Sequence, residues 1–164
     1  MNRECGLVLQ VNISNGGVPK RPVSGAFAGP LGLHGDAVAH PAIHGGPRQA
    51  LLLIAAEAVD EVAAEGFPIF YGALGENLTT RGLDPRSLRA GQRYRAGEAL
   101  LELTKPRTPC RTLDVYGQGI QSALWEKTIK TGNTESPLWG RSGFYAAVLE
   151  PGIIRPEDII RLVD

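Results

Sequence analysis

Cysteine is scarce in this chain, which has 164 residues but only two thiols, Cys5 and Cys110. Two cysteines cannot form the disulfide framework of a small secreted domain, and they are too few for a cysteine-built zinc site or an iron–sulfur cluster. No haem or flavin motif is visible either. The cysteine content therefore suits a reducing cytoplasm, and each thiol has to be judged as a single group.

The chain also lacks an excess of charge and a long apolar run. Lys plus Arg and Asp plus Glu both number 17, so no basic surface for nucleic acid is indicated. The apolar run at residues 51–56 is too short for a membrane span, and the N-terminus has too little apolar length for a signal peptide. We expect a single cytoplasmic domain over residues 1–164 that binds neither nucleic acid nor membrane.

Glycine and proline are abundant instead, with 21 and 12 residues, and they predict many turns between short elements. Between these turns, apolar alternation and apolar runs predict strands at residues 7–13, 49–54, 74–80, 99–104, 144–150 and 159–163. Helical spacing predicts a helix at 57–65 and another near Leu124, capped by Ser122 and ending before Gly132. The pattern favours a mainly β fold, a closed or half-closed antiparallel barrel with a few short helices.

Cys110 lies in the most unusual segment of the sequence. Residues 104–111, Thr-Lys-Pro-Arg-Thr-Pro-Cys-Arg, place it after two prolines and between Arg107 and Arg111. Prolines stiffen the loop, and neighbouring guanidinium groups favour the thiolate. From the residues alone, a protease-like nucleophile, a redox sensor and a metal ligand all stay open.

All three histidines lie within residues 34–44, directly before the sequence Gly45-Gly46-Pro47-Arg48. His40 and His44 are four positions apart, as zinc-binding helices require, but Pro41 and the two glycines oppose a continuing helix. Glycine lets the backbone approach a ligand closely, and arginine donates two hydrogen bonds to phosphate, so an anion pocket fits better. A plain turn with His44 bonded to a backbone carbonyl is the alternative.

Two further segments place polar groups at glycine turns. Glu76 and Asn77 follow Gly75 where a turn enters a strand, so they either belong to a site or satisfy turn amides. Arg141 opens a turn before Phe144 and Tyr145. Aromatic groups beside a cationic turn can hold a flat ring with a charged substituent, although such residues more often belong to the core.

Six motifs follow one another along the chain: Gly16-Gly17-Val18-Pro19-Lys20, Gly32-Leu33-x-Gly35-Asp36, His44-Gly45-Gly46-Pro47, Gly72-Ala73-Leu74-Gly75-Glu76-Asn77-Leu78, Pro109-Cys110 and Gly143-Phe144-Tyr145-Ala146. Their order resembles the MOSC domain, the molybdenum-cofactor sulfurase C-terminal domain. The resemblance is to the stand-alone bacterial type, similar to hydroxylaminopurine resistance proteins, and it covers nearly the whole chain.

The resemblance implies a β-rich fold related to the barrel domain of pyruvate kinase and a site for the molybdenum cofactor, molybdopterin. Cys110 matches the family's single cysteine, which either ligates molybdenum or carries a persulfide sulfur. Thiolate chemistry agrees with both roles. By chemistry we assign the cofactor's phosphate to Arg48, Arg107 and Arg141, and its pterin ring to His44 with Gly45 and Gly46, Glu76 and Asn77.

Two functions follow from the resemblance. In the first, the protein is a small molybdoenzyme that reduces N-hydroxylated compounds, with Cys110 as the molybdenum ligand and electrons from a separate donor protein. In the second, it is a sulfur-carrier module that takes a persulfide onto Cys110 from a sulfur-donor protein. A non-catalytic cofactor-binding domain is a third alternative, and nothing in the sequence decides for or against a homodimer. Pyridoxal phosphate is not expected, because it belongs to the separate desulfurase domain of full-length sulfurases.

Two residues lie outside these assignments. Cys5 precedes the first expected strand and belongs to no motif, so we expect Cys5→Ser to leave function intact. Glu157 stands before Asp158 where the family usually has glycine, a change expected to affect only a turn.

Overall fold

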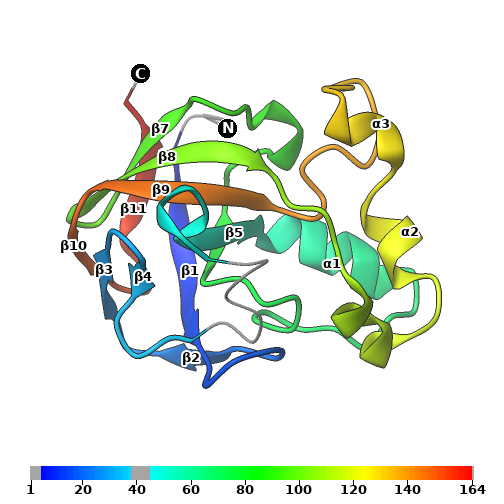
Figure 1. The fold of residues 1–164 in the computed structure, drawn as a ribbon, viewed down its shortest axis with the longest axis horizontal. Coiled ribbons are helices and arrows are strands. Elements are labelled where there is room, and N and C mark those ends of the chain that lie inside the picture. Colours follow the sequence, from blue (N-terminus) through cyan, green and yellow to red (C-terminus); the bar gives the residue numbers. More distant parts are fainter. Residues whose placement is uncertain (1–4, 38–44, 164) are drawn as a thin grey trace.

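The computed structural model of the protein describes residues 5–37 and 45–163. In this part of the chain, seven strands close into a barrel in the order β1, β11, β7, β8, β9, β5, β6 and back to β1 (Figure 1). The strands are β1 (Cys5–Ile13), β5 (Leu51–Ala55), β6 (Leu78–Arg81), β7 (Arg93–Ala96), β8 (Ala99–Pro106), β9 (Phe144–Glu150) and β11 (Ile159–Leu162). The predicted mainly β fold with a closed barrel is confirmed.

One pair of barrel strands departs from the expected antiparallel pattern, because β5 and β6 run parallel. All five residues of β5 are buried, and the helix α1 (Ala56–Ala64) that follows returns the chain to the start of β6. A crossover of this kind is what parallel neighbours require. The predicted helix at 57–65 is confirmed, whereas β6 begins later than expected, at Leu78.

The side chains of β5 alternate between two apolar clusters. Leu51 and Leu53 belong to the cluster inside the barrel, whereas Leu52 and Ile54 belong to a second cluster outside it, which contains residues of α1. Successive side chains of a strand point to opposite faces, so one uninterrupted apolar run serves both cores. Its first expected residue, Gln49, lies instead in the 3-10 turn η1 (Pro47–Gln49).

Several short strands were not predicted. Strand β2 (Arg21–Val23) pairs with β1, and a separate three-stranded sheet contains β3 (Ala26–Gly29), β4 (Gly32–Leu33) and β10 (Gly152–Ile154). These strands have two to four residues each, and β7 has four, so they are too short to show a period of two in the sequence. Figure 1 shows the small sheet on one side of the barrel and the helices on the other.

The prediction of one helix near Leu124 is wrong. Two helices form there, α2 (Ile120–Leu124) and α3 (Lys127–Lys130), and Ser122 lies inside α2 rather than at its cap. Trp125 separates them with an extended backbone and packs against both apolar clusters. The remaining short turns are η2 (Pro85–Ser87) and η3 (Arg111–Tyr116).

Cys5 and the C-terminal strand help to close the barrel. Cys5 begins β1 and is paired with Arg161 of β11, so it belongs to the sheet rather than to a loose terminus. The thiol is free and half-buried. The expectation that Cys5→Ser leaves function intact stays a prediction.

Glu157 is the one non-glycine residue with a positive φ in the described part of the chain, at 75°. Its N–H donates to the carbonyl oxygen of Val8 at 2.7 Å, which ties this strained turn to β1. Glycine adopts such a φ without steric cost, so Glu157→Gly should raise the free energy of unfolding by about 1 kcal/mol. Thermal unfolding should show a melting temperature roughly 3 °C higher.

The matched control is Glu135→Gly, at an exposed turn residue whose φ is not positive. This change only adds freedom to the unfolded chain and should not stabilise the protein. A Glu157→Gly variant no more stable than wild type would show that the turn carries no strain.

Candidate functional site

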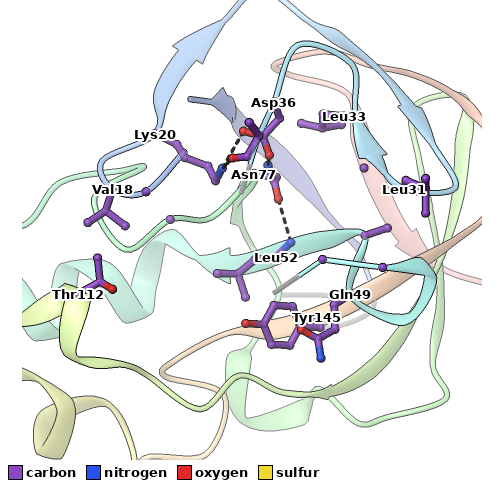
Figure 2. A pocket seen from close by; sticks show the side chains of 17 residues that line it. Val18, Lys20, Leu31, Leu33, Asp36, Gln49, Leu52, Asn77, Thr112 and Tyr145 are labelled. Atoms are coloured by element: carbon purple, nitrogen blue, oxygen red, sulfur yellow. Dashed lines mark hydrogen bonds and ion pairs between the residues drawn. The ribbon is translucent and has the colours of Figure 1, made fainter. Parts of the chain in front are cut away.

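A cavity of about 500 Å³ lies beside β5 and the loops around it (Figure 2). One wall is polar and contains Lys20, Asp36 and Asn77. Gln49 and Tyr145 lie across from that wall in Figure 2. The other described lining residues are apolar or small, with Thr112 as a further polar group: Gly17, Val18, Leu31, Gly32, Leu33, Ala37, Gly45, Gly46, Ala50, Leu52, Gly75 and Thr112.

The polar wall is held by a buried ion pair. Lys20 Nζ lies 2.7 Å from Asp36 Oδ1, and the two side chains are only 7% and 9% exposed. The same ammonium donates to Ser14 Oγ at 3.3 Å and to the carbonyl oxygen of Ala37 at 3.2 Å. Its three N–H groups are therefore occupied within the protein.

Asn77 continues this network toward β5. Its Nδ2 donates to Asp36 Oδ2 at 2.8 Å and to the carbonyl oxygen of Asn12 at 3.3 Å, while its Oδ1 accepts from the N–H of Leu52 at 3.1 Å. Asn77 lines the cavity, and its contact with a pterin stays a prediction. Both ends of its carboxamide are nevertheless engaged in holding β5, β1 and the Asp36 loop together.

Cys110 stands beside the cavity, at the start of η3. The half-buried thiol donates to Thr112 Oγ1 at 3.2 Å, and Thr112 lines the cavity. The hydroxyl of Thr112 can instead turn its hydrogen toward a thiolate. The loop predicted from the prolines thus brings Cys110 within one side chain of the cavity.

Arg107 is the buried arginine of the segment that contains Cys110, and it is 5% exposed. Its guanidinium donates to the carbonyl oxygen of Leu74 and, at 3.4 Å each, to the carbonyl oxygen and hydroxyl of Ser142. Burial lowers the pKa of Arg107, while the charges of Tyr145 and Cys110 oppose this shift, so the three groups act on one another.

Tyr145 connects Arg107 to the cavity. Its hydroxyl forms a hydrogen bond with Arg107, and its ring lines the cavity. Burial raises the pKa of Tyr145, and the charge of Arg107 lowers it. A neutral phenol therefore connects the cavity to the buried guanidinium of Arg107.

Glu76 is fully buried and does not line the cavity. Its Oε2 accepts from the N–H of Gly72 at 2.9 Å and from Thr79 Oγ1 at 3.1 Å, so it satisfies turn amides. Burial raises the pKa of Glu76, and Arg107 acts in the opposite direction. Gly72 cannot be replaced easily, because an added Cβ at its φ of 98° would lie 2.3 Å from the carbonyl oxygen of Lys20.

The other two predicted phosphate ligands point elsewhere. Arg48 is 64% exposed and pairs with Glu102 at 3.3 Å. Arg141 pairs with Glu65 at 2.6 Å and with Glu61 at 3.5 Å, so its guanidinium faces α1. Neither residue lines the cavity, and their role at a phosphate stays a prediction.

The structure describes only part of the segment that contains the histidines and the following glycines. Gly45 and Gly46 line the cavity, whereas His44 and His40 lie outside the described residues, so the pterin contact of His44 stays a prediction. Within residues 5–37 and 45–163, no group of three or more His, Cys, Asp or Glu side chains could hold a metal ion.

Sequence reasoning missed several lining residues. Lys20, Asp36 and Tyr145 belong to the motifs. No motif indicates that Lys20 and Asp36 form one wall of the cavity, or that Tyr145 forms a hydrogen bond with Arg107. Gln49 and Thr112 had no signal, because each is a common polar residue next to a more conspicuous one.

The fold and the site define a small β-barrel protein with a thiol beside a ligand-sized cavity. A model of the MOSC domain matches residues 40–161. The chain therefore belongs to the MOSC domain family. No helix among the described residues is both long and apolar enough to cross a membrane.

Two curated relatives and one solved structure are similar over most of the chain. Protein YiiM of Escherichia coli (strain K12) is 34% identical over 139 residues, which are 81% of this chain and 57% of YiiM. YflK of Bacillus subtilis (strain 168) is 32% identical over 144 residues, 85% of this chain and 60% of YflK. The crystal structure of YiiM from Geobacillus stearothermophilus superposes with a TM-score of 0.70 and 25% identity, covering 97% of this chain and 75% of that chain. The chain thus spans less than two thirds of the length of these two curated relatives.

Proposed function

We propose that this MOSC domain binds the molybdenum cofactor and that Cys110 ligates the metal in a small enzyme that reduces N-hydroxylated compounds. The observation that carries the proposal is the position of Cys110, which is hydrogen-bonded to Thr112 at the wall of a cavity of about 500 Å³ and interacts electrostatically with the buried guanidinium of Arg107. Ligand pockets for small molecules have volumes of this order.

The lining residues fit a flat, polar ring. Gly46 has a φ of 90°, and a Cβ added there would meet no described atom within 4 Å, so the backbone borders open space. Such a backbone can approach a ligand closely, and the apolar side chains of Leu31, Leu33 and Leu52 can cover ring faces. We therefore assign the contacts with the ring to Gly45 and Gly46 and to these three leucines.

The described lining residues offer no unpaired cation for the phosphate of the cofactor. Lys20 is the cation among the described lining residues, and its ammonium is already paired with Asp36. Arg107 interacts electrostatically with the thiol, and its guanidinium already donates to Leu74 and Ser142. We therefore assign Arg107 to the thiol and leave Arg48 and Arg141 as predicted phosphate ligands.

When bound, the molybdenum centre would supply the two-electron redox chemistry. The protein's part is to hold the thiolate of Cys110, with the Thr112 hydroxyl and Arg107 as stabilising neighbours, and to exclude water from a largely apolar cavity. Electrons would come from a separate donor protein. That partner and a cytoplasmic location are predictions.

A sulfur-carrier function is the second candidate, and the partial exposure of Cys110 favours it. A persulfide has to be reached by a sulfur donor, and a half-buried thiol beside a cation meets that condition. The two functions differ in what Cys110 carries, molybdenum or a second sulfur.

The test is to express the full chain in a cofactor-producing host and to purify it under reducing conditions. We expect stoichiometric molybdenum and pterin that are lost in Cys110→Ser and kept in Cys5→Ser, the matched thiol control. Metal-free protein with cyanide-labile sulfur on Cys110 would favour the carrier instead. Absence of molybdenum, pterin and labile sulfur from the wild type would contradict both functions.

A further inference from the structure

We propose that Gln49 determines ligand specificity in the cavity, by recognising a planar heterocycle in which an N–H donor stands next to a C=O acceptor, a lactam edge. The inference deepens the proposed function, because the pterin of the cofactor has such an edge. A purine-type substrate can have the same edge, so the chemistry is shared by two sources.

The cavity contains two carboxamides with opposite hydrogen-bonding states. Both ends of Asn77 are engaged by Leu52 and by Asn12 and Asp36. In contrast, Gln49 Oε1 is inaccessible to solvent and accepts no hydrogen bond from any described residue, and the side-chain amide donates to none of them either. Of the two, only Gln49 has a donor and an acceptor that no described residue engages, so a ligand that turned this side chain toward itself could use both.

The backbone that carries Gln49 is fixed. Its N–H donates to the carbonyl oxygen of Gly46 at 3.0 Å, which closes the turn η1. Next to it, the carbonyl oxygen of Arg48 accepts from Thr104 Oγ1 of β8 at 2.7 Å. The carboxamide is thus presented from a turn that is anchored to the barrel, as a recognition group requires.

The surroundings of Gln49 suit a ring. Figure 2 shows its side chain beside the ring of Tyr145, and Tyr145 is the cross-strand partner of Leu52. An aromatic and an aliphatic lining residue offer flat apolar contact to ring faces, while the amide meets a ring edge. The amide oxygen would accept the lactam N–H, and the amide NH₂ would donate to the lactam C=O.

The experiment measures binding of two probes to the purified full chain by titration calorimetry. The probes are pterin (2-amino-4-oxopteridine) and hypoxanthine, and unsubstituted purine, which lacks the lactam edge, is the comparison ligand. Gln49→Met, which keeps the length of the side chain but removes both polar groups, should weaken probe binding about tenfold to a hundredfold. It should leave purine binding unchanged.

Two more variants make the result specific. Gln118→Met, at an exposed residue outside the cavity lining, should change none of the affinities. Gln49→Glu keeps an acceptor but loses the donor, so it should also weaken lactam binding. Tighter pterin binding in Gln49→Glu would indicate an edge with two donors and would overturn the proposal. Melting temperatures establish that each variant is folded.

The outcomes separate this inference from the proposed function. If Gln49→Met weakens the binding of pterin alone, the inference is supported and the ligand is the cofactor. If it weakens the binding of hypoxanthine alone, the inference is supported and the ligand is a substrate. Failure of both probes to bind wild type, or unchanged affinities in Gln49→Met, overturns it even if Cys110 binds molybdenum. Gln49-dependent ring binding in a protein that never takes up molybdenum or sulfur contradicts the proposed function alone.

Discussion

Arg107→Met is expected to lower the free energy of unfolding by about 3 kcal/mol and the melting temperature by roughly 10 °C. Met replaces the apolar stem of Arg107 but leaves the carbonyl oxygens of Leu74 and Ser142 without their donor. It also removes the cation that acts on the fully buried carboxyl of Glu76. Urea unfolding followed by tryptophan fluorescence measures the change.

Arg111→Met is the matched control, since Arg111 lies on the other side of Cys110 and is exposed. Truncating an exposed arginine should change stability by no more than about 0.5 kcal/mol. If both variants lose the same small amount, the two arginines are equivalent, as their spacing in the sequence suggests, and the buried role of Arg107 is refuted.

The barrel was predictable where its strands are long and apolar. Residues 144–150 were predicted as a strand, and β9 has the same limits. The apolar run at residues 51–54 lies within β5, since burial on both faces requires such a run. The sequence could not indicate that β6 pairs in parallel with β5, because that depends on how α1 crosses back. Nor could it indicate β3 and β4, which together contain six residues.

The site was predictable only in part, because the state of a polar side chain depends on distant neighbours. Cys110 could be singled out from adjacent prolines and arginines. Asn77, in contrast, is engaged by groups 25, 41 and 65 positions away. The chemistry of Arg141 suggests a phosphate ligand, but nothing near it in the sequence indicates its ion pair with Glu65, which lies just after α1. Gln49 is distinguished by the hydrogen bonds that it does not make, which no local pattern records.

Asp36→Ala is expected to lower the free energy of unfolding by about 3 kcal/mol, because it leaves the buried ammonium of Lys20 without a counter-charge. The pair is close, at 2.7 Å, and nearly inaccessible to solvent. Asp36 also accepts from the N–H of Ser14 at 2.9 Å and from Asn77 Nδ2 at 2.8 Å, and these donors lose their partner as well. Chemical unfolding at neutral pH measures the loss.

Two comparisons identify the source of this loss. Glu150→Ala removes one partner of the exposed pair with Arg95, 3.2 Å apart, and should cost less than about 1 kcal/mol. The double variant Lys20→Met, Asp36→Leu removes both buried charges and should recover a large part of the stability lost in Asp36→Ala. A double variant as unstable as Asp36→Ala would instead assign the loss to the hydrogen bonds with Ser14 and Asn77. Recovery would mean that the core tolerates an apolar pair here, so that the ion pair serves the cavity, where Asp36 orients Asn77.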